Sequence, residues 1–302
     1  MEKMNYHNAV LLKQSVDGLD IKPDGVYVDV TFGGGGHSRE ILKFLGTNGK
    51  LFAFDQDLDA LNNAIDDDRF TLINENFRHV KRFLRLNGVK KVDGILADLG
   101  VSSHQFDIAE RGFSTRFDAD LDMRMNQNDS KSAFEIINYY DEKTLADLIF
   151  QYGELRSARK IASKIIEARK NEAIKTSFQL KEILTEFIPK AKEHKILAQL
   201  FQALRIEVNQ EIEVLKEFLL QTMSLLKEGG KLSVISYHSL EDRLVKRLIQ
   251  KGMFEGEPEK DFYGNFYVPY KKDGKLIVPN REEIKLNNRA RSARLRIATR
   301  LK

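Results

Sequence analysis

Four consecutive glycines, Gly33 to Gly36, form the part of this chain best suited to holding a ligand. They follow an apolar run at 26–31 and precede a segment of helical character at 38–45. Each glycine in an ordered segment costs ~0.5–1 kcal/mol relative to alanine, so four cost roughly 2–4 kcal/mol unless bare backbone is needed. A tight turn, the alternative, normally uses one or two glycines where a positive φ is required. The pattern therefore predicts a strand, a glycine loop and a helix that present main-chain N–H groups to a nucleotide cofactor.

Two aspartates stand where such a cofactor would be bound. Asp55 ends the second strand-like run, about 20 residues beyond the loop, where an acid accepts hydrogen bonds from ribose hydroxyls. Asp98 closes the fourth strand-like run, at the carboxyl edge where open α/β sheets bind ligands. The loop lacks the Gly-Lys-Ser/Thr ending of a P-loop, which argues against a P-loop nucleoside triphosphatase.

NAD and S-adenosylmethionine are the two cofactors that fit this arrangement. NAD needs its pyrophosphate on a helix N-terminus, whereas S-adenosylmethionine carries no phosphate and favours acids rather than bases nearby. The acids of this region are Asp29, Asp55, Asp57 and Asp98, and they favour S-adenosylmethionine. His37 has no second histidine or paired acid near it in the sequence. It is therefore expected to contact the ligand or to cap the helix, and no metal site is predicted.

Alternating strand-like and helical runs must position these residues. Strands are expected at 26–31, 51–55, 71–74 and 92–99, with helices at 38–45, 58–65 and 80–86. This alternation predicts an α/β fold with a doubly wound, Rossmann-like parallel sheet covered on both faces. The segment from 130 to about 226 is helical throughout, with apolar residues at i, i+3, i+4 and i+7. A strand at 231–237 and a helix at 240–249 then continue the sheet.

An all-helical domain inserted into the sheet domain is the simplest account of this order. The expected boundaries are 1–110 for the first part of the sheet domain, 111–215 for the insertion, and 216–302 for the second part with a basic C-terminal tail. An insertion of roughly one hundred residues is within the usual size of a domain.

The composition is that of a globular protein, with 302 residues, 42% apolar and 31% charged, and no cysteine. The absence of cysteine excludes disulfides, thiolate metal sites and cysteine nucleophiles. No apolar run approaches the length of a membrane span, and the first residues contain no apolar signal core. A cytoplasmic protein without membrane contact is therefore expected.

The C-terminal segment 271–302 holds most of the excess positive charge. It contains 11 Lys and Arg against three acids, a balance of +8, which leaves about −4 on the rest of a chain whose net charge is +4. Arginine suits phosphate recognition, so this segment predicts nucleic-acid binding. The arginines concerned are Arg289, Arg291, Arg294, Arg296 and Arg300.

Further blocks of sequence resemble one known family. They read Thr31-Phe32-Gly33-Gly34-Gly35-Gly36-His37-Ser38, Asp98-Leu99-Gly100-Val101-Ser102-Ser103, Glu110-Arg111-Gly112-Phe113-Ser114, Leu121-Asp122-Met123-Arg124-Met125, Phe201-Gln202-Ala203-Leu204-Arg205-Ile206 with Val208-Asn209, and Ser236-Tyr237-His238-Ser239-Leu240-Glu241-Asp242-Arg243, followed by Arg289-Ala290-Arg291-Ser292. Together they are similar to the ribosomal RNA small-subunit methyltransferase H family, and the resemblance covers nearly the whole chain.

The resemblance implies an S-adenosylmethionine-dependent methyltransferase that makes N4-methylcytidine in the decoding region of 16S rRNA of the small ribosomal subunit. It also implies that the inserted helical domain recognises RNA. Carried over by position, the cofactor contacts are Gly35, Gly36, His37, Asp55, Phe77, Asp98 and Gln105. Phe77 would pack against adenine, and an ordinary core aromatic is the alternative.

Asp98 is the expected catalytic residue, with the backbone of 100–103 as the other candidate, because the site needs a group that accepts hydrogen bonds from the cytosine amine and receives its developing charge. RNA contacts are expected at Arg289, Arg291, Arg294 and His238, and the target base is expected to leave its stack beside His238, Tyr237 and Phe113. Core packing is the alternative for the last three. The sequence leaves the oligomeric state open, a homodimer included. A dehydrogenase or a non-catalytic RNA-binding factor would each explain only part of the pattern.

Overall fold

The structure is a computed structural model that describes residues 9–185, 187–260, 262–264 and 267–302. The chain divides into two compact units, each with its own core. Unit 1 comprises the residues up to Gly100 together with Ile212–Lys302, and unit 2 is Val101–Glu211. Both boundaries of the inserted unit lie somewhat earlier in the chain than the 111 and 215 expected from sequence.

Unit 1 is built on a seven-stranded sheet in the order β3-β2-β1-β4-β5-β7-β6. Its strands are β1 (Val26–Asp29), β2 (Lys50–Phe54), β3 (Phe70–Ile73), β4 (Val92–Asp98), β5 (Leu226–Ser236), β6 (Tyr270–Ile277) and β7 (Arg294–Arg300). The first five are parallel, and β7 runs antiparallel to both β5 and β6. Strands β1 to β4 lie within two residues of their predicted bounds, whereas β5 begins five residues before the predicted start at 231. The doubly wound, Rossmann-like sheet is confirmed.

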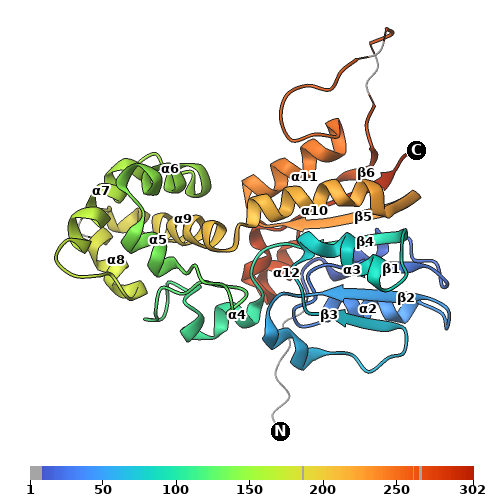
Figure 1. Cartoon of the computed structure of the whole chain (residues 1–302), viewed down its shortest axis with the longest axis horizontal. Helices are drawn as coiled ribbons and strands as arrows, with labels where there is room; N and C mark the ends of the chain where they lie inside the picture. The colour runs from blue at the N-terminus through green and yellow to red at the C-terminus, as the bar shows by residue number, and fades with distance from the viewer. Residues whose placement is uncertain (1–8, 186, 261, 265–266) are drawn as a thin grey trace. The chain divides into compact units, whose positions relative to one another are not determined.

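Helices cover both faces of this sheet (Figure 1). One face packs on α3 (Val80–Leu86), α10 (Glu211–Leu225) and α11 (Ser239–Lys251), through a core that includes Leu84, Phe218 and Leu248. The other packs on α1 (Leu12–Asp17) and α2 (Gly36–Phe44). Strands buried on both faces explain the continuous apolar runs that predicted them.

The segment 58–65, expected as an α-helix, forms a 3₁₀ helix, η1 (Leu58–Asn63). The carboxylate of Asp57 caps it by accepting from the N–H of Asp59 at 3.2 Å, and its flanking bonds, Ala60 N–H to Asp57 O and Ala64 N–H to Leu61 O, are of the i+3 type. Leu58 and Leu61 stay 47% and 42% exposed, so little packing holds a longer helix here.

The basic segment 271–302 is part of the sheet and not a free tail. β6 and β7 extend the sheet beyond β5, and α12 (Arg281–Leu286) and η4 (Asn288–Ser292) lie between them in sequence. Leu295 and Ala298 of β7 are fully buried. These buried apolar side chains hold β7 in the sheet. The arginines that flank them indicated the charge of the segment but not that it forms a strand.

Unit 2 is helical, as predicted. It contains α4 (Ser103–Asp107), η3 (Ala109–Arg111), α5 (Ala133–Tyr139), α6 (Glu142–Gly153), α7 (Ala158–Arg169), α8 (Ser177–Thr185) and α9 (Lys190–Asn209). Its core is separate from that of unit 1 and includes Ile136, Ile161, Leu200 and Leu204. Within the residues that the structure describes, no helix has the length and apolar character needed to cross a membrane.

Candidate cofactor and methyl-transfer site

The chemistry-bearing residues of unit 1 meet where the strand order reverses. β2 and β3 lie on one side of β1, and β4 and β5 lie on the other. Ligands of open α/β sheets bind outside the carboxyl ends of the strands at such a point. The glycine loop leaves β1 and Asp98 ends β4, and the two are joined because the N–H of Asp98 donates to Thr31 Oγ1 at 2.6 Å.

The four glycines make a turn that other residues could not make. Gly33 and Gly35 have φ of 50° and 76°, in the left-handed region that favours glycine. A Cβ on Gly35 would stand 2.9 Å from the Phe32 ring, and one on Gly36 would stand 2.9 Å from Ala9 Cβ. Helix α2 begins at Gly36, so the main chain of Gly35 and Gly36 opens at a helix N-terminus.

Asp55 is fixed at the end of β2 by the glycine loop itself. Its Oδ2 accepts from the N–H of Gly33 at 2.7 Å, and its Oδ1 accepts from the N–H of Asp57 at 2.9 Å. Burial raises the pKa of Asp55 to about 6, and the two N–H donors oppose that rise. Each carboxylate oxygen retains a second lone pair, which suits ribose hydroxyls.

Asp29 supports the site by holding its loops, and its carboxylate is not exposed to a ligand. It is fully buried, its Oδ2 accepts from the hydroxyl of Ser38 at 2.7 Å, and its Oδ1 accepts from the N–H of Thr31 at 3.1 Å. Asp57 is likewise buried and caps η1. Asp29 and Asp57 therefore hold the loops on which Asp55 and Asp98, the two acids predicted to contact the cofactor, depend.

Asp98 carries a carboxylate with two different neighbours. Tyr237, directly after β5, donates its hydroxyl to Asp98 Oδ1 at 2.7 Å. Asp98 Oδ2 lies 3.9 Å from Nδ1 of His37. The Asp98 side chain is 21% exposed, so a ligand can reach part of it. Sequence reasoning placed Tyr237 beside the base and missed this hydrogen bond, for which no local pattern exists because 139 residues separate the partners.

His37 is buried, and the nitrogen of its ring that does not face Asp98 fixes its orientation. Its Nε2 lies 3.1 Å from the carbonyl oxygen of Val10. Because a carbonyl only accepts, Nε2 carries the hydrogen, and Nδ1 is left facing Asp98.

Phe77 and Gln105 occupy different units. Phe77 follows β3 in η2 (Phe77–His79), is partly exposed, and packs edge-on against Phe218 at 5.2 Å between ring centroids. One side of Phe77 thus belongs to the core, which leaves the adenine role a prediction. Gln105 lies in unit 2, where its Oε1 accepts from the N–H of Ser102 at 3.1 Å and caps α4. Its cofactor role also stays a prediction.

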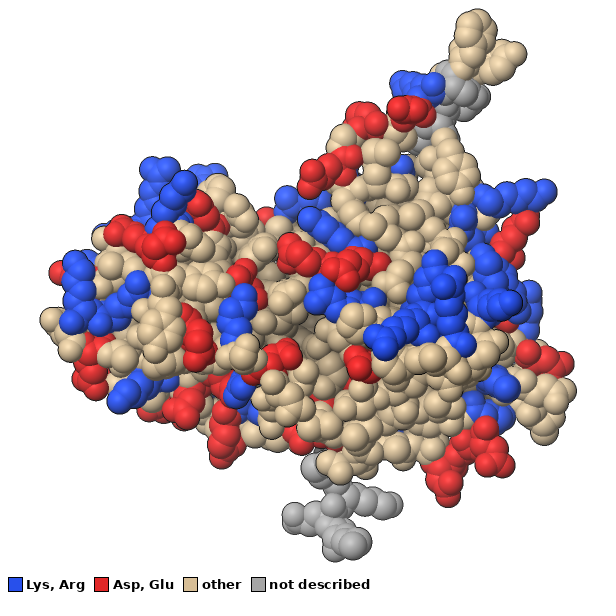
Figure 2. Space-filling view, viewed as in Figure 1, with Lys and Arg blue, Asp and Glu red and all other residues tan. Residues whose placement is uncertain are grey.

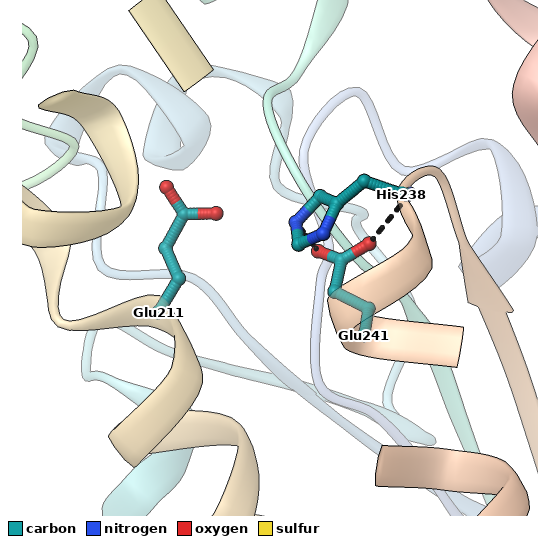
Figure 3. A group of neighbouring side chains, drawn as sticks. All are labelled: Glu211, His238 and Glu241. Atoms are coloured by element: carbon teal, nitrogen blue, oxygen red, sulfur yellow. Dashed lines mark hydrogen bonds and ion pairs between the residues drawn. The ribbon is translucent and has the colours of Figure 1, made fainter. Parts of the chain in front are cut away.

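His238 is a buried imidazole next to a buried carboxylate (Figure 3). Glu241 Oε2 accepts from the N–H groups of Tyr237 and His238, at 2.9 and 3.3 Å. The other oxygen of Glu241 lies 3.2 Å from His238 Nε2. The other ring nitrogen, Nδ1, has no hydrogen-bond partner within the described part of the chain. Glu211, drawn in the same view, is held by two bonds from Arg205, at 2.8 and 2.9 Å.

The predicted RNA-binding arginines have unequal surroundings. Arg294 is half exposed and lies 3.3 Å from Asp242, which Arg296 also binds through two bonds of 2.7 and 3.0 Å. Arg291 is exposed, and Arg289 is partly buried within η4. Phe113, a predicted neighbour of the target base, is buried in the core of unit 2, which agrees with the alternative of core packing.

Comparison with known proteins identifies the family of this chain. Residues 4–301 match the model described as the MraW methylase family. The chain belongs to this family. Among curated relatives, the proteins named "Ribosomal RNA small subunit methyltransferase H" of Flavobacterium johnsoniae and Christiangramia forsetii are 67% and 68% identical over 298 residues, with 99% of each chain covered. The relative of that name from Bacteroides thetaiotaomicron is 53% identical over 298 residues, with 98% of each chain covered.

Family membership confirms the predicted resemblance and the cofactor, S-adenosyl-L-methionine. The residues of unit 1 fit this group. An acid with free lone pairs at Asp55, a partly exposed aromatic at Phe77 and a partly exposed carboxylate at Asp98 suit a ribose, an adenine and a cationic amino-acid part. The glycine turn, on which a Cβ would clash, brings bare main chain to the same edge.

Proposed function

We propose that this chain transfers a methyl group from S-adenosylmethionine to N4 of a cytidine in the decoding region of 16S rRNA. The collinear sequence blocks support this, as do the names of relatives that are 53–68% identical over nearly the whole chain. An rRNA substrate also supports the cytoplasm as the place of reaction.

The observation that carries the proposal is the carboxylate of Asp98 at the switch point of the sheet. One oxygen accepts from the hydroxyl of Tyr237, and the other lies 3.9 Å from Nδ1 of His37. The cofactor, when bound, supplies an electrophilic methyl group on a sulfonium. Cytosine N4 is a poor nucleophile because its lone pair is delocalised into the ring. Asp98 Oδ2 is suited to accept a hydrogen bond from this amine, which localises the lone pair and stabilises positive charge on it.

Orientation contributes the larger part of the barrier reduction in this proposal. Holding two reactants at about 3–3.5 Å can supply ~7–11 kcal/mol. The residues that give the site its rigidity are Thr31 and Tyr237, which fix Asp98, and Val10, which fixes His37. All of these bonds are formed within unit 1.

His238 is the proposed contact for the extruded base. A flipped base is recognised through hydrogen bonds to its edge. The His238 side chain is 8% exposed, and its Nε2 is paired with Glu241 at 3.2 Å, whereas its Nδ1 has no partner among the described residues. Burying a polar nitrogen without a partner is costly, so a ligand that bonds to Nδ1 gains affinity. Arg289, Arg291 and Arg294, together with the inserted helical unit, remain the proposed contacts for the RNA backbone.

The decisive experiment is transfer of labelled methyl groups to assembled small subunits and to naked rRNA, followed by digestion and identification of the nucleoside. We expect label in N4-methylcytidine from one of the two substrates. Label on another atom or nucleoside would contradict the base assignment, and no transfer to either substrate would contradict the function.

Asp98→Ala should reduce methyl transfer at saturating cofactor by at least 10²-fold, because both the acceptor and its charge are lost. The exposed Asp17 of α1 offers a control for loss of one carboxylate, and Asp17→Ala should retain normal turnover. Single-turnover rates with saturating S-adenosylmethionine measure the effect. Near-normal turnover of Asp98→Ala would remove Asp98 from the reaction.

A further inference from the structure

A second basic segment lies outside the C-terminal region. Residues 78–91 contain six Lys and Arg and no acid, in a unit that carries the ligand site. They form the end of η2, helix α3 and the turn into β4. Figure 2 shows Lys and Arg side chains gathered over α3. We call the four residues Lys81, Arg82, Arg85 and Lys90 the α3 patch.

The α3 patch differs from the C-terminal arginines in the charges around it. No residue of the patch has an ion-pair partner among the residues that the structure describes. The nearby acids are already engaged, since Glu217 binds Arg78 at 2.7 Å and Asp93 binds Lys227 at 2.7 Å. In the C-terminal segment, by contrast, Asp242 holds Arg294 and Arg296.

Two hydrogen bonds tie the end of η2 and the start of α3 to helix α10. Gln221 of α10 accepts from the N–H of Lys81 at 3.1 Å and donates to the carbonyl of Arg78 at 2.7 Å. The patch therefore presents its charges from a rigid helix. Arg82 and Arg85 are exposed, and the Arg82 guanidinium lies 5.7 Å from the centroid of the Phe83 ring. Planar arginine held in this way suits phosphate oxygens.

The position of α3 in the fold relates the patch to the site. η2 and α3 directly follow Phe77, beyond the carboxyl end of β3, and α3 then returns towards the start of β4. The patch thus begins at the ligand edge and continues for about 10 Å along the flank of the sheet, at 1.5 Å per helical residue. An RNA strand whose target base is held at that edge must leave along a flank.

We propose that the α3 patch binds the phosphate backbone of the substrate RNA. This inference rests on the proposed function, because it takes the polyanion to be the RNA that is methylated. Contacts to phosphate add affinity without sequence preference and make binding depend on salt.

The test compares two variants of the full chain that lose the same charge. One carries Arg82→Gln, Arg85→Gln and Lys90→Gln. The control carries Lys13→Gln, Lys22→Gln and Lys50→Gln, all exposed in unit 1 and without an ion pair to any residue that the structure describes. Fluorescence anisotropy measures binding of a labelled decoding-region RNA and of an unrelated RNA of equal length over a salt series. Calorimetry with S-adenosylmethionine reports whether each variant keeps its folded site.

The patch variant should weaken binding of both RNAs on the order of tenfold at 0.1 M salt. It should also lower the salt slope by about 2, because each phosphate that is no longer neutralised reduces the slope by ~0.7. The control should match the wild type, and cofactor affinity should not change. A patch variant with the wild-type slope, or an equal loss in the control, would overturn the inference. Failure of the proposed function would look different, since the wild type itself would then transfer no methyl group to rRNA.

Discussion

Asp98 has an environment that sets both its orientation and its ionisation. Burial raises its pKa to about 6. His37 and the hydrogen bond from Tyr237 oppose this rise, while the negative charges of Asp29 and Glu241 add to it. A catalytic acceptor must be ionised, so activity should increase as the pH rises through about 6.

Tyr237→Phe removes the donor to Asp98 Oδ1 and keeps the aromatic ring. We expect the rate of methyl transfer to fall roughly tenfold or more, because a hydrogen bond to a charged group contributes ~1.5–3 kcal/mol. Because that bond lowers the pKa of Asp98, the acid limb of the pH–rate profile should also move to higher pH. The pH dependence of single-turnover rates measures both effects.

Tyr270→Phe is the matched control for this change. Tyr270, the first residue of β6, is a buried tyrosine whose hydroxyl lies 2.6 Å from Thr222 Oγ1 in the core of unit 1. It should affect stability without moving the pH profile. If both variants shift the profile alike, or if neither does, Tyr237 has no special role in positioning Asp98.

Among the elements of unit 2, hydrogen bonds tie three family blocks together. Arg111 donates to the carbonyls of Arg124 and Met125, both at 3.0 Å. Asn209, at the end of α9, accepts from the N–H of Met125 at 2.7 Å and donates to the carbonyl of Met123 at 2.9 Å. The blocks therefore support the conformation of segment 121–125, in which Met123 has a φ of 61°.

Asn209→Ala should destabilise unit 2, because it leaves the N–H of Met125 and the carbonyl of Met123 buried without their partner. Each unsatisfied group costs ~1–3 kcal/mol, so the free energy of unfolding should fall by roughly 2–6 kcal/mol. Urea unfolding measures the loss, and hydrogen exchange should report it mainly within residues 101–211. The exposed Asn171, changed to Ala, is the control and should alter neither measurement. Equal stability of the two variants would contradict a structural role for Asn209.

At the scale of the whole molecule, the site and its surroundings in unit 1 differ in the sign of their charge. The ligand edge of unit 1 carries the carboxylates of Asp55 and Asp98, whereas uncompensated positive charge lies on α3. Such a distribution suits a cationic cofactor at the edge and a polyanion along the flank.

Affinity for S-adenosylmethionine should decrease as the pH falls from 7.5 to 5. Asp55 and Asp98 both have pKa values raised to about 6, so they become protonated in this range and lose the charge that attracts a cation. We expect at least a tenfold rise in Kd, measured by calorimetry. S-adenosylhomocysteine lacks the sulfonium charge and should show a shallower dependence. A pH-independent affinity would contradict the proposed contact between these carboxylates and the cofactor.

Short-range patterns in the sequence were enough to predict the parallel sheet, the family and the cofactor. Apolar runs and the four glycines specify strands, loop and helix, which is why β1 to β4 were predicted within two residues of their bounds, whereas β6 and β7 were not predicted as strands. The same patterns placed Asp55 and Asp98 at strand ends, where the parallel sheet brings them to one edge.

Tertiary packing, in contrast, determines which polar groups are buried and hydrogen-bonded within the fold and which can bind ligands. Asp29 and Asp57 have the same chemistry as Asp55 and Asp98, yet burial and local hydrogen bonds make them structural. The bond between Tyr237 and Asp98 joins residues on two strands that are adjacent in the sheet and far apart in the chain. Likewise, net charge alone predicted RNA binding by the C-terminal segment. In the structure, Arg294 and Arg296 of β7 are paired with Asp242, whereas the positive charges of the α3 patch are not paired within the part of the chain that the structure describes. Such pairings arise from packing over long sequence separations, and no local pattern encodes them.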